Sequence, residues 1–210
     1  MNIDDAADQA ELVLAGRPVP RTWDRVRRYC GLEWSGGPPE VWAYGYYDTI
    51  STDPGAVDPL DVLSTAALHP GLSRADLAFF AEQRLEIEAW IAPLPLGLGL
   101  ADADDATLEH LERLAVWPAA PTLALLSKVL HRKRPELIPL VDRHVVDWYR
   151  PVTGERSAPR AWPLLLRAMR HDLADNAQAF DTLGTATVSR LDQRMSDLRI
   201  ADIALWMGSR

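Results

Sequence analysis

The spacing of hydrophobic positions is helical along most of the chain. Apolar residues recur every three or four positions, and Ser, Thr, Asp and Pro stand where such runs begin. The pattern predicts helices over 3–15, 22–30, 58–68, 73–92, 105–116, 121–134, 142–150, 161–174, 176–183 and 197–207. Alternation typical of a strand never extends beyond a few residues. We therefore expect a mainly α fold, with residues 1–210 in a single helical domain of two lobes.

The segment 33–57 lacks a clear period and is rich in Gly, Pro and aromatic residues. So many rings would not remain free in water, which predicts an ordered loop or two short extended pieces. Asp48 could contact a base edge or act as a second acid. The rings could stack on an extruded base, or they could simply hold the loop against the core. These candidate base-binding residues are Trp42, Tyr44, Tyr46 and Tyr47.

Asp142 begins a helix and shares one helical face with Val145, Val146 and Tyr149, which follow at three, four and seven residues. Burying an unpaired charge costs several kcal/mol, roughly. A carboxylate at a helix N-terminus can instead accept backbone N–H bonds. Asp142 is thus expected to be a capping residue, or a capped carboxylate that also stabilises a cationic transition state.

Basic residues gather on and after the helix predicted over 121–134, on the side opposite its leucines. They could form an edge that binds phosphate, or they could complement the dipole at the end of the helix. The candidate phosphate-binding residues are Lys128, His131, Arg132, Lys133, Arg134 and, on the next helix, Arg143; His144 is a candidate substrate contact.

The net charge of −8 argues against a protein that coats nucleic acid over its whole surface. Residues 121–170 nevertheless hold ten Lys and Arg against four acids, so a local basic surface could contact DNA. With the single Cys30, no long apolar run and an acidic N-terminus, the chain is expected to be cytoplasmic, with no membrane partner. The five histidines show no metal-ligand spacing, and no cofactor is expected.

The stretch "IPLVDRHVVDWY" resembles the "VD-x-HV" segment of the helix-hairpin-helix DNA glycosylase superfamily. In that superfamily the aspartate opens the helix after the hairpin, beside the scissile N-glycosidic bond. The resemblance covers about 30 residues and implies a helix pair over about 121–150 with Asp142 as the catalytic residue. The longer pattern "SKVLHRKRPELIPLVDRHV", with "LRIADIALWM", also resembles a family of uncharacterised bacterial proteins over about 40–207.

The chain departs from the glycosylase pattern at the hairpin. The glycine-containing "LPGVGxxTA" is replaced by "WPAAPTLAL", which removes the residues that let backbone amides approach a phosphate. The position of the lyase lysine falls near Ala124, one turn before Lys128. The resemblance therefore implies a monofunctional enzyme, and no cysteine set for an iron–sulfur cluster is present.

Three functions remain open from the sequence. The first is a monofunctional N-glycosylase that removes a modified base, for example from foreign DNA. The second is a nucleic-acid-binding or protein-interaction module without chemistry. The third is an enzyme acting on a small nucleoside-like metabolite. Asp202, on the apolar face of the last predicted helix, is expected to pair with an arginine in the core.

Overall fold

A computed structural model describes residues 2–32, 43–69, 71–117 and 122–208. These residues are mainly helical, as expected, with one two-stranded sheet among them. In chain order the elements are α1 (Ile3–Asp8), β1 (Leu12–Leu14), β2 (Arg17–Val19), α2 (Thr22–Tyr29), η1 (Tyr44–Asp48), α4 (Pro59–Ser64), η2 (Thr65–Ala67), α5 (Arg74–Glu82), α6 (Arg84–Ile91), η3 (Leu100–Asp102), α7 (Asp105–Glu112), η4 (Arg113–Val116), α8 (Leu123–His131), α9 (Arg143–Thr153), α10 (Ala158–Asp175), α11 (Ala177–Leu191) and α12 (Asp197–Gly208).

The helix expected over 3–15 is wrong beyond Asp8. Ala15 and Gly16 adopt positive φ values and form a tight turn, which lets β1 pair antiparallel with β2. The backbone N–H groups of Val13 and Ala15 donate to side chains at the end of α10, at 2.8 and 2.7 Å. Side-chain oxygens at the end of a distant helix thus accept hydrogen bonds from backbone N–H groups at this edge of the sheet. The local sequence pattern does not predict the strand.

The first residues of the helices agree with the sequence prediction better than the extent of the first helix does. Asp58 and Ser73 both form capping boxes, at α4 and α5. Thr22 is an exception, because it is the first residue of α2 and its hydroxyl donates to the Val19 carbonyl instead of capping. The helix expected over 73–92 is divided at Gln83 into α5 and α6.

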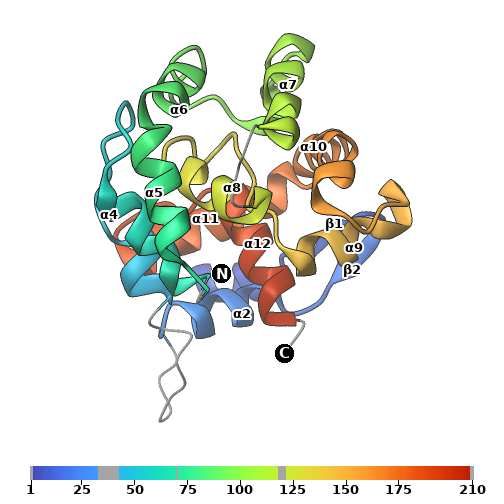
Figure 1. Cartoon of the computed structure of the whole chain (residues 1–210). Helices are drawn as coiled ribbons and strands as arrows, with labels where there is room; N and C mark the ends of the chain where they lie inside the picture. The colour runs from blue at the N-terminus through green and yellow to red at the C-terminus, as the bar shows by residue number, and fades with distance from the viewer. Residues whose placement is uncertain (1, 33–42, 70, 118–121, 209–210) are drawn as a thin grey trace.

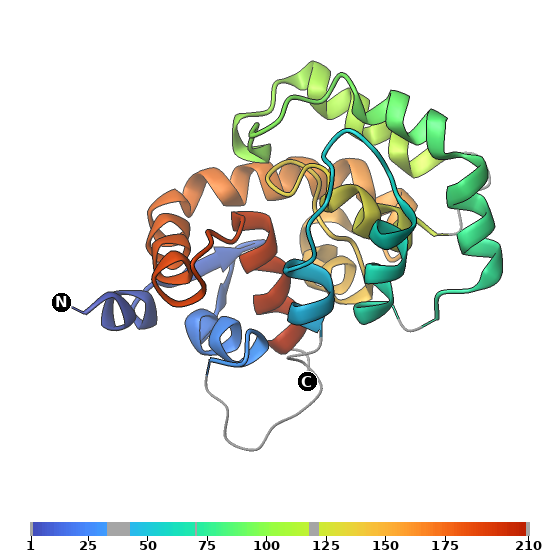
Figure 2. The same cartoon turned by 90° about the vertical axis from the view of Figure 1, so that its left-hand side faces the viewer.

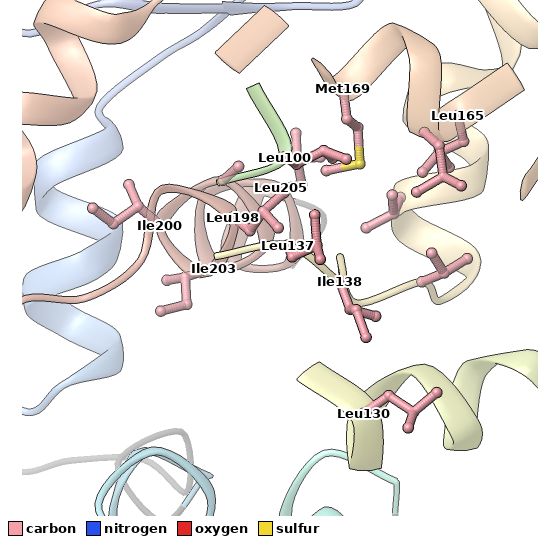
Figure 3. Close-up of a cluster of buried hydrophobic side chains, with 14 of the residues drawn as sticks. Leu100, Leu130, Leu137, Ile138, Leu165, Met169, Leu198, Ile200, Ile203 and Leu205 are labelled. Atoms are coloured by element: carbon pink, nitrogen blue, oxygen red, sulfur yellow. The ribbon is translucent and has the colours of Figure 1, made fainter. Parts of the chain in front are cut away.

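The buried hydrophobic side chains form one cluster that reaches from α1 to α12. Figure 1 places α6 and α7 at the top of the molecule and α2 and α12 at the bottom. Figure 2 shows α5–α7 gathered on one side and α1, α2, α11 and α12 on the other, with α10 running between them. In Figure 3, Leu198 and Leu205 of α12 lie beside Leu137 of the segment that joins α8 to α9, and Leu100 lies between them and Met169 of α10. This packing fixes the start of α9 against α12.

No helix among residues 2–32, 43–69, 71–117 and 122–208 is long and apolar enough to cross a membrane.

Candidate functional site

Asp142 lies at the N-terminus of α9, as the sequence predicts. Its Oδ1 accepts hydrogen bonds from the backbone N–H groups of His144 (2.8 Å) and Val145 (3.1 Å). The three apolar residues that share its face, Val145, Val146 and Tyr149, are all buried. The carboxylate is only partly buried, and two backbone bonds fix its orientation. This confirms the predicted cap.

The Asp142 side chain faces a small cavity of about 10 Å³, roughly the space of one water molecule. We call it the Asp142 cavity. It is lined by Tyr29, Leu68, Lys128, Asp142, Arg199, Asp202, Ile203 and Trp206. Residues from α2, α8 and α12 therefore meet the start of α9 around one small space that is lined by two carboxyl groups and an amine.

Lys128 supplies the amine of this cavity from α8. The residue is 4% exposed, and its Nζ makes one long hydrogen bond, 3.4 Å to the carbonyl oxygen of Ala124 on its own helix. Burial lowers the pKa of Lys128, while Asp142 and Asp202 act in the opposite direction. The side chain reaches back one turn, so the amine lies beside position 124.

His69 lies near the same amine. Burial and, after it, the positive charge of Lys128 lower the pKa of this half-buried imidazole. Leu68, its neighbour in the chain, lines the cavity. The sequence gives no reason to connect His69 with Asp142, because the two residues lie on elements that meet only in the fold.

Arg199 organises the carboxyl groups behind the cavity. Its Nε and Nη2 donate to Asp48 at 2.7 and 2.9 Å, its Nη1 donates to Asp202, and its Nη2 also donates to the Tyr29 hydroxyl. The Tyr29 hydroxyl in turn donates to Asp48 at 2.8 Å. The expected pairing of Asp202 with a core arginine is confirmed.

Asp202 is the most perturbed acid near the cavity. Its pKa is raised to about 7, chiefly by burial and also by the charges of Asp142 and Asp48, against the lowering effect of Arg199 and Lys128. The residue is 8% exposed. Asp202 therefore exchanges its proton near neutral pH, within the space that Asp142 faces.

A second cavity, of about 230 Å³, lies on the other side of Arg199. Its walls come from the segments 47–52, 131–136 and 193–199, and it includes Asp48 and Arg132. Asp142 and Lys128 are not among its lining residues. The larger cavity is thus separate from the Asp142 cavity, with Arg199 as the shared wall.

The basic residues on and directly after α8 do not form the exposed edge that the sequence suggests. Lys128, His131, Arg132, Lys133 and Arg134 are all buried. Lys133 Nζ donates to Asp61 and, at 2.9 Å, to the carbonyl oxygen of Asp53. Arg132 Nε donates to the same Asp61 at 3.2 Å. Arg132 and Lys133 are therefore buried in ion pairs with Asp61, an acid from a distant helix, and do not form a surface that could bind phosphate.

Arg134 and His131, two other members of this basic group, are held by backbone carbonyl groups. Arg134 Nε donates to the carbonyl oxygen of Leu94 at 2.7 Å. His131 Nδ1 lies 2.7 Å from the Ile138 carbonyl oxygen, and burial lowers the pKa of its ring to about 4. The neutral imidazole also stacks on Tyr47, with 6.4 Å between ring centroids.

Within the aromatic segment, Tyr44–Asp48 form a short π-helical turn, η1, that the sequence does not predict, whereas residues 49–57 form a loop, as expected. Tyr47 is buried and its hydroxyl donates to the Lys128 carbonyl oxygen at 2.7 Å. Tyr44 is half-buried and accepts a hydrogen bond from Gln193, whereas Tyr46 is 58% exposed. None of these three rings lines the Asp142 cavity. Trp42 lies outside the described residues.

The remaining predicted contacts flank Asp142 directly. Arg143 is exposed at the first position of α9, and no ion pair joins it to another residue in the described part of the chain. His144 is half-buried, and its backbone N–H donates a hydrogen bond to the capping carboxylate of Asp142. Of the six predicted phosphate-binding residues, Arg143 alone faces solvent.

The described part of the chain contains no group of three or more His, Cys, Asp or Glu side chains arranged to hold a metal ion. Cys30 is buried, and burial raises the pKa of its thiol to about 12. This thiol is therefore unreactive at neutral pH.

Comparison with known protein families gives a match over most of the chain. The model of a family of unknown function, DUF6308, matches residues 22–209. No curated protein and no solved structure matches the chain.

Proposed function

Because the chain belongs to DUF6308, a family without an assigned function, we propose its function from the site: a monofunctional DNA N-glycosylase that excises a modified base. The observation that carries the proposal is the position of Asp142. Its carboxylate is oriented by two backbone N–H groups and lines a small cavity together with Lys128 and Asp202.

The chemistry of base excision requires such a carboxylate. As the bond between the sugar and the base breaks, positive charge develops on the sugar ring. A preorganised negative charge in an enclosed site of low dielectric stabilises that charge without reorganising during the reaction. The same carboxylate can orient or deprotonate the attacking water. The cavity at Asp142 has room for that water and not for a base, so the base would lie outside it.

Contact with DNA would involve the surface around the start of α9. Arg143 is exposed beside Asp142, and its planar guanidinium suits a phosphate oxygen pair. His144 is the next residue and is accessible in part. The buried cations that follow α8 have no part in this contact, because their donors are already bound to Asp61 and to backbone carbonyl groups.

The proposal is tested by incubating the protein with duplex and single-stranded DNAs that carry different modified bases. Free base and alkali-labile sites should form with at least one of them, and should not form with the Asp142→Asn variant. Strand cleavage without alkali would show that Lys128 acts as a lyase and that the enzyme is bifunctional. Salt-dependent DNA binding without base release from any substrate would favour a binding module.

A second candidate is an N-glycosyl hydrolase that acts on a small nucleoside-like metabolite. The burial of five of the six expected phosphate-binding residues favours it, because a free nucleoside needs no long basic surface. Release of base from nucleosides, with no salt-dependent binding to DNA, would support this candidate and exclude the first.

A further inference from the structure

Asp202 is the second carboxyl group of the Asp142 cavity. It comes from α12 and is held by a hydrogen bond from Arg199 Nη1. Asp142 enters the same space from the start of α9. Because the cavity has room for about one water molecule, any proton that leaves one carboxylate is close to the other.

The charges around Asp202 do not balance when every group is ionised. Asp142 shares its cavity and Asp48 of η1 accepts from the same Arg199, which makes three carboxyl groups against the two cations Lys128 from α8 and Arg199. Tyr29 from α2 is neutral because burial raises the pKa of its phenol well above the usual value, and burial and the charge of Lys128 lower the pKa of His69, which favours its neutral form. An uncompensated buried charge is costly. Binding one proton makes the cluster neutral.

Hydrogen bonds indicate which carboxyl group binds that proton. Asp48 accepts two hydrogen bonds from Arg199 and one from Tyr29, and Asp142 accepts two from backbone N–H groups. Among the described residues, Asp202 accepts a single hydrogen bond, from Arg199 Nη1. Hydrogen bonds to an ionised carboxylate favour the ionised form, so the proton is expected on Asp202.

We propose that Asp142 and Asp202 form a coupled pair across the cavity: in the resting protein Asp202 holds one proton, and once it has released that proton to solvent it accepts a proton from Asp142 during the reaction. The raised pKa of Asp202 and the contribution of Asp142 to it agree with this arrangement. The catalytic use of the pair rests on the proposed function, whereas the coupling itself does not.

In the proposed hydrolysis the exchange proceeds as follows. The bond between sugar C1′ and the base nitrogen breaks, and its electron pair leaves with the base, which takes a proton from solvent. The water oxygen bonds to C1′, and the proton it loses goes to Asp142. That proton crosses the cavity to the ionised Asp202 and is later released to solvent. The reaction therefore requires Asp202 to be ionised when water attacks.

The coupling is tested without any substrate. In protein labelled with ¹³C at the aspartate carboxyl carbons, one signal should titrate with a pKa of about 7 and should be absent from Asp202→Asn. In Asp142→Asn, which retains the cap, the same signal should titrate at lower pH, because a neighbouring negative charge is gone. Asp147→Asn, an exposed change on α9, is the matched control and should not move it.

The catalytic use is tested by the pH dependence of base release. For the wild-type chain the rate should rise with pH through about 7. In Asp202→Asn the rate should fall on the order of a hundredfold, and this rise should disappear. A rise that persists in the variant, or an Asp202 signal unmoved by Asp142→Asn, would overturn the proposal. If the two groups titrate as a coupled pair but no substrate releases a base, the coupling of Asp142 and Asp202 is supported and the glycosylase function is rejected.

Discussion

Asp61 of α4 and Lys133, which follows α8, form an ion pair across 72 residues of sequence, with side chains only 1% and 0% exposed. Burial alone would raise the pKa of Asp61. Hydrogen bonds from Lys133, Thr52 and the Asp58 backbone outweigh it and hold that pKa below its ordinary value. The pair therefore joins α4 to the segment that leads from α8 to Asp142.

Replacing Lys133 with Met should destabilise the protein, because it leaves Asp61 buried with Arg132 as its remaining cation. Breaking a buried pair in this way costs about 3–5 kcal/mol. Denaturant unfolding measures the loss. Arg167→Met removes the exposed ion pair with Glu112 and should change the free energy of unfolding by less than about 1 kcal/mol. Unchanged stability with weaker DNA binding in Lys133→Met would restore a role in phosphate binding.

The sequence predicts the helices and the position of Asp142 well, because those features depend on neighbouring residues. A stripe at three, four and seven residues behind an aspartate identifies both a cap and a buried face. The capping boxes at Asp58 and Ser73 are equally local.

The composition of the cavity and the fate of the basic residues could not be predicted in this way. Whether Lys133 is exposed depends on Asp61, and whether Asp202 meets Asp142 depends on how α9 packs against α12. The stripe that holds Asp202 indicates burial and a core partner, but not the neighbouring amine of Lys128. Long-range contacts of this kind leave no periodic signal in a single chain.

Arg143 is expected to contribute to DNA binding, because it is the exposed cation beside Asp142. Arg143→Ala should weaken binding to all sequences alike and reduce the slope of log affinity against log salt by about one. Fluorescence anisotropy over a range of salt concentrations measures both. Arg113→Ala, an exposed arginine on η4, is the control and should leave the slope unchanged. An equal effect of both changes would show nonspecific attraction only.

Stability should respond to pH through two groups that oppose each other. The pKa of His131 is lowered to about 4, so its contribution is complete above about 6.5 and is lost as pH falls toward 4. The pKa of Asp202 is raised to about 7, so its contribution is complete below about 3.8 and is lost as pH rises toward 7. Between pH 4 and 6.5 the two slopes cancel.

Asp202→Asn should remove one of these slopes. Its free energy of unfolding, relative to that of the wild-type chain, should increase with pH by up to about 1.4 kcal/mol per unit between pH 4 and 7. Urea unfolding at several pH values measures the difference. A constant difference over that range would mean that Asp202 ionises in the folded protein as it does in an unfolded chain.

Asp142 should prove more important for activity than for stability. Asn keeps the size of Asp and the oxygen that accepts hydrogen bonds from the His144 and Val145 N–H groups. The free energy of unfolding of Asp142→Asn should therefore lie within about 1 kcal/mol of that of the wild-type chain. Base release should fall on the order of a hundredfold or more, because the fixed negative charge is lost. Asp142→Ala also removes the cap and should cost about 0.5–2 kcal/mol in addition.

Melting curves and base-release assays on the same preparations separate the two effects. Full activity in a stable Asn variant would make Asp142 a cap alone, whereas unfolding of that variant would make its charge part of the core ion cluster.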